Sequence, residues 1–242
     1  MSQLGGQLAL VTGAGTGIGR AISLRLAAAG ATVCLVGRRQ EHLQAVAQLA
    51  GESGGRCVGY PTDITSTSEL EGLRAHVERE FGSLDVLVHS AGVITLGRVD
   101  EVDTKDLDWQ YQVNVRGAYA LTRAFLPMLK TRQGQVVFVN SSVGLTARAG
   151  TGSYAATKHA LRALADSLRD EVNGEGIRVL SIFLGRTASE MQSEIHRVEG
   201  KSYRPDRLMQ PEDVAWVVVN ALLVPRTAEV TEVRMRPMRK SD

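Results

Sequence analysis

Short apolar runs alternate with longer amphipathic stretches along the whole chain. The runs lie at residues 7–11, 32–36, 56–60, 86–89, 135–140, 178–183 and 229–235. Most of them are continuously apolar rather than alternating, a pattern typical of strands buried on both faces of a sheet. The pattern therefore predicts about seven strands in a mainly parallel sheet that helices cover.

Helix-length segments separate these runs. We expect helices over residues 18–29, 40–50, 66–81, 107–129, 153–172 and 211–223. Pro211 opens the last of them, ahead of two acids that suit the positive end of the helix dipole. The alternation of strand and helix over residues 1–242 predicts an α/β fold, a single-domain doubly wound parallel sheet (Rossmann fold) with helices on both faces.

Composition excludes several classes of protein. The chain has 242 residues, 43% of them hydrophobic and 22% charged, which suits one sizeable core rather than disorder. The net charge is only +2, and no basic run is interleaved with aromatic residues, so we expect no nucleic-acid partner. We find no secretory signal and no apolar run of about 18 residues, which predicts no membrane partner and a cytoplasmic location. Cys34 and Cys57 lie in apolar segments without metal-ligand spacing, so we expect no metal site.

Glycines gather directly after the first apolar run, where residues 12–19 read Thr-Gly-Ala-Gly-Thr-Gly-Ile-Gly. Glycine allows a sharp turn and a close approach of pyrophosphate, and the following helix offers free N–H groups and a positive dipole end. The spacing is T-G-x-x-x-G-x-G, and a flexible turn is the alternative interpretation. Its place between a strand and a helix favours dinucleotide binding. The predicted ligands are Gly13, Gly15, Thr16, Gly17, Ile18 and Gly19.

Two arginines, Arg38 and Arg39, follow the second apolar run. Sites that prefer NAD usually carry an acid here to hold the ribose 2′-hydroxyl, whereas arginine pairs with the 2′-phosphate of NADP. The alternative is that both arginines are merely the solvated start of a helix. Because arginine suits bidentate phosphate binding, we predict NADP(H) as the cofactor and favour NAD(H) less.

Candidate chemistry lies later in the chain, around Ser141, Tyr154 and Lys158. Ser141 follows the fifth apolar run, on the ligand side of a doubly wound sheet. Tyr154 comes thirteen residues later, and Lys158 follows it at i+4, on the same face of the predicted helix. Ser142 is the weaker alternative to Ser141.

These motifs together resemble the short-chain dehydrogenase/reductase family over essentially the full length of the chain. The resemblance rests on the glycine motif, Ala91-Gly92 after the fourth run, Asn114-Val115-Arg116-Gly117, Ser141 and the Y-x-x-x-K spacing of Tyr154 and Lys158. Each piece alone is weak, but their order and spacing are specific.

The resemblance implies roles for these residues. Tyr154 would exchange a proton with the substrate oxygen, and Ser141 would hydrogen-bond that oxygen. Lys158 would bind the nicotinamide ribose and lower the pKa of Tyr154 from its ordinary value of about 10. Asn114 would hold a water between Lys158 and solvent, although a simple capping role is the alternative. Further cofactor contacts would come from Asp63, Ile64, Ala91, Gly92, Gly185 and Thr187, with Asp63 otherwise an ordinary loop acid.

The chain departs from the family pattern at several positions. His89-Ser90 stands where the family usually has Asn-Asn, and we expect His89 to be a core histidine. Leu184 replaces the usual proline before Gly185, which removes a fixed φ. The segment over residues 187–210, expected to cap the substrate, is short and polar.

The sequence thus predicts an NADP(H)-dependent oxidoreductase that transfers hydride between the nicotinamide and a small-molecule carbonyl or secondary alcohol. The alternative is a catalytically silent nucleotide-binding sensor or scaffold of the same fold, although such proteins usually lose the tyrosine or the lysine. The family resemblance also implies a homodimer or homotetramer, built through the long helices.

Overall fold

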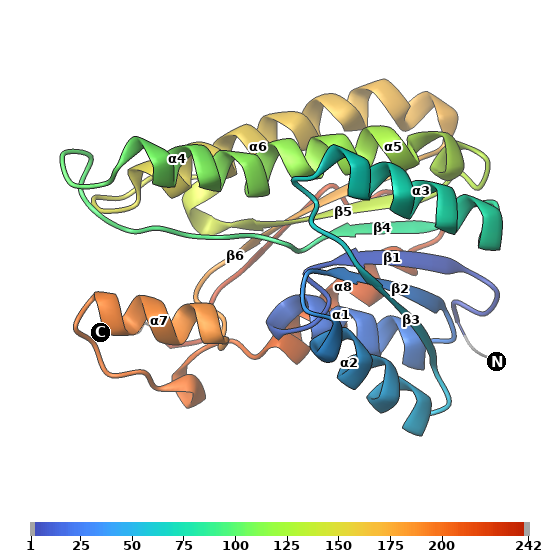
Figure 1. The fold of residues 1–242 in the computed structure, drawn as a ribbon, viewed down its shortest axis with the longest axis horizontal. Coiled ribbons are helices and arrows are strands. Elements are labelled where there is room, and N and C mark those ends of the chain that lie inside the picture. Colours follow the sequence, from blue (N-terminus) through green and yellow to red (C-terminus); the bar gives the residue numbers. More distant parts are fainter. Residues whose placement is uncertain (1–2, 240–242) are drawn as a thin grey trace.

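Seven parallel strands form one open sheet through the middle of the molecule (Figure 1). The computed structural model describes residues 3–239. The strands are β1 (Leu8–Thr12), β2 (Thr32–Gly37), β3 (Arg56–Pro61), β4 (Val86–His89), β5 (Gln135–Ser141), β6 (Arg178–Leu184) and β7 (Glu232–Met235). Their order is β3-β2-β1-β4-β5-β6-β7. The winding direction changes between β1 and β4, and at such a point the carboxyl ends of the strands border a ligand crevice.

Helices cover both faces of the sheet. In Figure 1, α3 (Thr67–Phe81), α4 (Thr104–Tyr111), α5 (Ala118–Lys130) and α6 (Gly152–Val172) lie on one face. The other face carries α1 (Gly17–Ala28), α2 (Gln40–Glu52) and α8 (Pro211–Leu222), while α7 (Glu190–Val198) lies beyond the strand ends. The predicted doubly wound α/β fold is therefore confirmed. Among residues 3–239, no helix has both the length and the apolar character needed to cross a membrane.

Two hydrophobic cores sandwich the sheet because neighbouring strand residues point to opposite faces. Val33 and Leu35 of β2 join the core beneath α1 and α8, whereas Cys34 and Val36 join the core beneath α3 and α5. Burial raises the pKa of the Cys34 thiol to about 12. Most of the continuous apolar runs are thus strands covered on both sides, whereas the edge strands β3 and β7 are partly exposed.

The predicted helix over residues 107–129 is wrong in its bounds and its regularity. It begins earlier, at Thr104, because the Asp103 side chain caps it by accepting a hydrogen bond from the Lys105 amide at 2.8 Å. Between α4 and α5 the chain forms a π-helix, Gln112–Gly117, whose wider turn contains one more residue than an α-helical turn. Asn114 lies inside this turn.

Two other boundaries differ from the prediction. Strand β7 begins at Glu232 rather than at residue 229, because the Glu229 carboxylate accepts a hydrogen bond from the Val179 amide at 2.8 Å. Helix α7 lies in the segment over residues 187–210, expected to be short and polar and to cap the substrate. Its N-cap is Ser189, whose side chain accepts a hydrogen bond from the Gln192 amide at 3.1 Å.

Candidate active site

The glycine turn after β1 is packed so closely that side chains do not fit at two of its positions. A Cβ on Gly13 would lie 3.0 Å from backbone atoms of Ala91, and a Cβ on Gly19 would lie 2.3 Å from the Gly13 carbonyl oxygen. Gly13 also has a φ of 64°, in the left-handed region. The turn therefore brings the end of β1, the start of α1 and the end of β4 together.

Thr12 joins β1 to the segment that follows β4. Its hydroxyl oxygen accepts hydrogen bonds from the amides of Ser90 and Ala91, at 3.0 and 3.1 Å. The hydroxyl itself donates to the Val88 carbonyl at 3.3 Å. A threonine side chain thus ties these strands at the place where the family's asparagine is absent.

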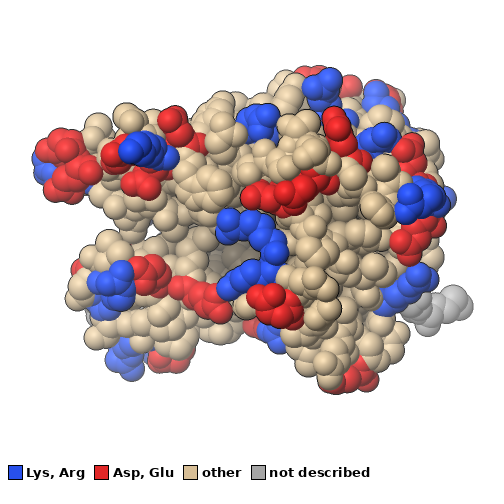
Figure 2. Space-filling view, in the orientation of Figure 1, with Lys and Arg blue, Asp and Glu red and all other residues tan. Residues whose placement is uncertain are grey.

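A cavity of about 220 Å³ opens at the switch point of the sheet. Its lining includes nine of the predicted cofactor residues: Gly13, Gly15, Thr16, Arg38, Arg39, Asp63, Ile64, Ala91 and Gly92. Gly17, Ile18, Gly19, Gly185 and Thr187 do not line it. Figure 2 shows Lys and Arg atoms at the edge of a hollow on this face, with Asp and Glu atoms close by. The cavity wall suits the phosphates of a dinucleotide, since its glycine floor admits a close approach and its rim carries cationic side chains.

Among the residues of the cavity wall that the sequence prediction missed are His42, Trp109 and Val113. His42 lies at the start of α2, and a Cβ on Gly15 would lie 2.9 Å from the His42 Cβ. Trp109 and Val113 are four residues apart and therefore lie near the same helix face. In the sequence, only the short distance of Trp109 and Val113 from Asn114 could have indicated that these two residues lie at the site.

The two arginines at the end of β2 have different neighbours. The Arg38 guanidinium carbon lies 5.9 Å from the centroid of the Trp109 ring. Arg39 reaches across to α7, where its guanidinium lies 4.0 Å from the Glu190 carboxylate. Both arginines line the cavity, and both are exposed where α2 begins, so their role towards a cofactor stays a prediction.

Asp63 also lines the cavity, but part of its carboxylate is engaged locally. Its Oδ1 accepts hydrogen bonds from the Thr65 amide at 2.9 Å and from the Thr65 hydroxyl at 2.7 Å. These bonds fix the turn that leads from β3 towards α3. The carboxylate is thus both a loop-forming group and part of the cavity wall.

Ser141, Tyr154 and Lys158 meet beside this cavity. Ser141 ends β5 and hydrogen-bonds the Tyr154 phenol. The Lys158 ammonium lies 5.7 Å from the Tyr154 ring centroid and donates a hydrogen bond to the Val139 carbonyl at 3.2 Å. A Cβ on Gly92 would lie 3.8 Å from the same ammonium, so the lysine lies next to a residue of the cavity wall.

Burial controls the protonation of both ionisable groups. Desolvation raises the pKa of Tyr154 to about 12, and the hydrogen bond from Ser141 opposes this rise only in part. Burial lowers the pKa of Lys158 to about 8, because the charged ammonium loses its hydration. The expected lowering of the Tyr154 pKa by Lys158 is thus not seen in the protein alone, where burial raises this pKa and only Ser141 opposes the rise.

Asn114 connects three segments around the lysine. Its Nδ2 donates to the Val93 carbonyl at 2.9 Å and to the Thr157 hydroxyl at 3.1 Å. Its Oδ1 accepts from the Val93 amide at 2.8 Å and would lie 3.4 Å from a Cβ on Gly92. These bonds tie the π-helix to the chain after β4 and to α6, which a helix cap alone would not do.

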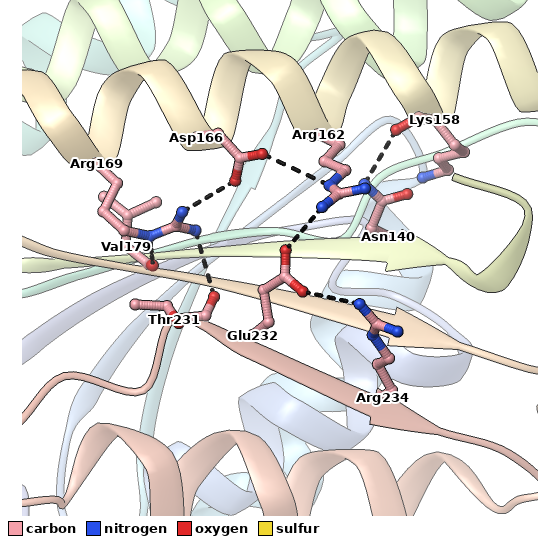
Figure 3. A network of polar contacts seen from close by, with 9 residues as sticks. All are labelled: Asn140, Lys158, Arg162, Asp166, Arg169, Val179, Thr231, Glu232 and Arg234. Atoms are coloured by element: carbon pink, nitrogen blue, oxygen red, sulfur yellow. Dashed lines mark hydrogen bonds and ion pairs between the residues drawn. The ribbon is translucent and has the colours of Figure 1, made fainter. Parts of the chain in front are cut away.

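Asn140 fixes β5 and α6, which carry Ser141 and Lys158, against each other (Figure 3). Its Oδ1 accepts a hydrogen bond from the Ser141 amide at 2.7 Å, and its Nδ2 donates to the Lys158 carbonyl at 3.1 Å. The side chain is buried, and Gly144 leaves it room, since a Cβ there would lie 2.5 Å from the Asn140 oxygen. The sequence prediction did not single out Asn140.

A separate network of ion pairs joins α6 to β7, beginning one helical turn after Lys158 (Figure 3). Arg162 lies one turn after Lys158, 3.5 Å from Asp166 and 3.4 Å from Glu232. Asp166 in turn pairs with Arg169 at 2.9 Å, and Glu232 pairs with Arg234 at 3.4 Å. The network anchors the helix that carries Tyr154 and Lys158 to β7, the edge strand of the sheet.

Gly185 and Thr187 lie at the end of β6. The Gly185 amide donates to the Met235 carbonyl at 2.8 Å, and a Cβ on Gly185 would lie 3.1 Å from Pro237. Leu184, which replaces the family's proline, pairs with Ser141 and Met235 in the sheet. The leucine thus keeps β6 regular up to the turn.

His89 is a core residue, as predicted. Its Nε2 lies 2.8 Å from the Thr122 hydroxyl, and its ring stacks on Phe138 with centroids 4.7 Å apart. Burial lowers the pKa of His89 to about 3, so the ring is neutral at physiological pH.

A glycine turn at the switch point of a doubly wound sheet, with a serine, a tyrosine and a lysine beside it, defines a dinucleotide-dependent class of α/β protein. A family model described as short chain dehydrogenase matches residues 7–200. The chain therefore belongs to the short-chain dehydrogenase/reductase family of oxidoreductases.

Individual relatives cover nearly the whole chain. A protein of Staphylococcus aureus strain USA300, named an uncharacterized oxidoreductase, is 31% identical over 239 residues, 98% of this chain and 100% of its own length. Among solved structures, an alcohol dehydrogenase of the archaeon Thermococcus sibiricus, complexed with 5-hydroxy-NADP, has a TM-score of 0.89 and 26% identity, covering 98% of each chain. A metagenomic short-chain oxidoreductase in complex with NADP has a TM-score of 0.86 and 29% identity, covering 99% of this chain and 100% of its own.

Proposed function

We propose that the protein is an NADP(H)-dependent oxidoreductase that interconverts a carbonyl and a secondary alcohol, with Tyr154 as its acid/base. The observation that carries this proposal is the meeting of Ser141, Tyr154 and Lys158 beside Gly92 of the cavity. A catalytically silent sensor of the same fold would not need these three side chains to lie together.

The residues of the cavity fit the proposed cofactor. The glycine turn would receive the pyrophosphate, and Arg38 and Arg39 would meet the 2′-phosphate. Asp63 and Ile64 line the region between these arginines and Gly92, where the adenosine would lie. NADP(H) would supply or accept the hydride. Two related structures were solved with NADP-type ligands, which supports this choice.

Tyr154 would move the proton. During reduction its neutral phenol would donate a proton to the substrate oxygen, and its raised pKa keeps the phenol protonated for that step. During oxidation the phenolate would accept the proton from the alcohol. The hydrogen bond from Ser141 and the charge of Lys158 would stabilise that phenolate. Asn114 would hold the water that connects Lys158 to solvent.

The proposed activity can be tested by following NADPH absorbance with a panel of ketones and aldehydes, and NADP⁺ reduction with secondary alcohols. Turnover in both directions is expected, and calorimetry should give a lower dissociation constant for NADPH than for NADH. Cofactor binding without turnover of any panel member by protein that carries an intact Tyr154 would favour the sensor.

Two coarser expectations accompany the activity. Residues 187–210 would cap the substrate, since α7 reaches the cavity rim through Glu190. The chain would form a homodimer or homotetramer, a proposal supported by the exposed apolar side chains of Leu107, Tyr111 and Tyr119 on the long helices. Size-exclusion chromatography with light scattering tests the second, and a monomer at micromolar concentration would contradict it.

A further inference from the structure

Arg38 and Arg39 are adjacent, but the protein holds them by different means. Arg39 pairs with the Glu190 carboxylate, whereas within residues 3–239 no ion pair involves Arg38. The Arg38 guanidinium carbon instead lies 5.9 Å from the centroid of the Trp109 ring. Both Arg38 and Trp109 line the cavity. The neighbour of Arg38 is thus an uncharged aromatic ring from another part of the chain.

An aromatic ring holds a guanidinium without using its hydrogen-bond donors. The attraction acts between the cation and the ring face, so the N–H groups in the guanidinium plane stay available. A carboxylate partner, by contrast, accepts from those N–H groups and offsets the charge. Arg38 therefore keeps both its charge and its donors for a ligand in the cavity.

We infer that Trp109 determines cofactor specificity: it holds Arg38 in position for bidentate binding of the ribose 2′-phosphate. Arginine has a long, flexible side chain, and fixing it in advance lowers the entropy lost on binding. Trp109 reaches the cavity from α4, just before the π-helix that carries Asn114. The inference rests on the proposed NADP(H) function and assigns Trp109 to the phosphate rather than to the adenine.

Calorimetry with two small probes separates these roles. Adenosine 2′,5′-bisphosphate carries the 2′-phosphate and 5′-AMP lacks it, so the ratio of their dissociation constants measures phosphate recognition alone. Trp109→Ala should reduce the preference for the bisphosphate about threefold or more, while Trp109→Phe should retain most of it because the ring remains. Arg38→Gln should nearly abolish the preference.

The second tryptophan provides a matched control. Trp216 lies on α8, on the opposite face of the sheet, and is 55% exposed. Trp216→Ala should leave the ratio of the two dissociation constants unchanged. The Trp109 side chain is 39% exposed, so its replacement should leave the fold intact, which circular dichroism would verify.

Several results would overturn the inference. An unchanged ratio in Trp109→Ala would remove Trp109 from phosphate recognition, and an equal weakening of both probes would make it an adenine contact. Loss of the preference in Arg39→Gln but not in Arg38→Gln would assign the phosphate to the other arginine. A wild-type protein without any preference for the bisphosphate would instead contradict the proposed cofactor itself, and the inference with it.

Discussion

At the β2 end of the crevice the charged groups stand in solvent, whereas at the β5 end they are enclosed. The side chains of Arg39 and Glu190 are 55% and 76% exposed, while Lys158 is only 5% exposed. Charges in water attract weakly and are screened by salt, but charges in a dry environment act strongly and shift pKa values. The first region is therefore suited to selecting a ligand, and the second to controlling a proton.

The largest expected effect lies in the enclosed region. Tyr154→Phe removes the hydroxyl that would exchange the proton, so turnover should fall by roughly 10² or more, the usual contribution of a positioned acid or base. NADPH affinity and the melting temperature should hardly change, because little volume is lost. Steady-state kinetics and calorimetry test this, with Tyr119→Phe as the control, since that side chain is 55% exposed on α5. Near-normal turnover in Tyr154→Phe would assign the proton to another group.

The lysine should affect binding and proton transfer together. If Lys158 binds the ribose as proposed, Lys158→Met should weaken NADPH and NADH alike, by about tenfold or more, because a charge-assisted bond is lost. The variant should also need higher pH for alcohol oxidation, because a cation that favours the phenolate is gone. Fluorescence titration and a rate profile from about pH 6 to 10 test both effects, around the ordinary phenol pKa. Unchanged affinity with an unchanged profile would refute the role and revive the sensor.

The pKa of Lys158 predicts a pH dependence in the wild-type protein. Its burial lowers the pKa to about 8, so the ammonium is charged below that pH and neutral above it. The cofactor affinity should therefore fall as the pH rises through about 8. Calorimetry at a series of pH values should show this fall in the wild type and a flatter curve in Lys158→Met. Parallel curves would mean that another group causes the change.

A variant of Asn140 tests whether Ser141 and Lys158 depend on the hydrogen bonds that hold their two segments together. Replacing it with leucine leaves the Ser141 amide and the Lys158 carbonyl without their partner, which should lower the free energy of unfolding by about 1–3 kcal/mol. Turnover should drop more than NADPH affinity, because Ser141 and Lys158 lose their fixed relation. Urea denaturation and kinetics measure these effects, with the exposed Asn220→Leu as control. A drop in stability with unchanged turnover would make Asn140 purely structural.

The smallest expected effect is that of salt on NADPH binding, through the exposed charges at the β2 end of the crevice. Raising the ionic strength from ~0.1 M to ~1 M shortens the screening length from about 10 to about 3 Å. NADPH binding should weaken severalfold relative to NADH, whereas turnover at saturating NADPH should stay nearly constant. Titrations at several salt concentrations would measure this, and a loss of turnover as large as the loss of affinity would contradict the contrast between the two regions.

Most of the fold could be predicted, because strands that are buried on both faces have continuous apolar sequences. The sequence prediction started strand β7 too early, at residue 229. In the structure the side chain of Glu229, rather than its backbone, accepts the hydrogen bond from the Val179 amide. Helix α7 was missed because it buries polar residues, among them Gln192 and His196, rather than an apolar stripe. The π-helix leaves no periodic signal that distinguishes it from an ordinary helix.

The candidate site was predictable where a short motif carries it and not where distant segments meet. Ser141, Tyr154 and Lys158 follow from spacing, and the structure brings them together. Trp109 and Asn140 have no motif, and their roles depend on contacts across the fold. The resemblance also placed Gly185 and Thr187 at the cofactor, whereas the structure puts them outside the cavity lining. That assignment remains a proposal.

In the π-helix, Gln112–Gly117, the number of residues matters as much for the site as their identity. An α-helical residue advances by about 100°, so one added residue rotates everything before it relative to everything after it. Here α5 can turn Leu121 and Phe125 towards the sheet while Trp109 still faces the cavity. Deleting Gln112 should restore an ordinary helix and swing Trp109 away from Arg38, although every side chain named in the site would still be present.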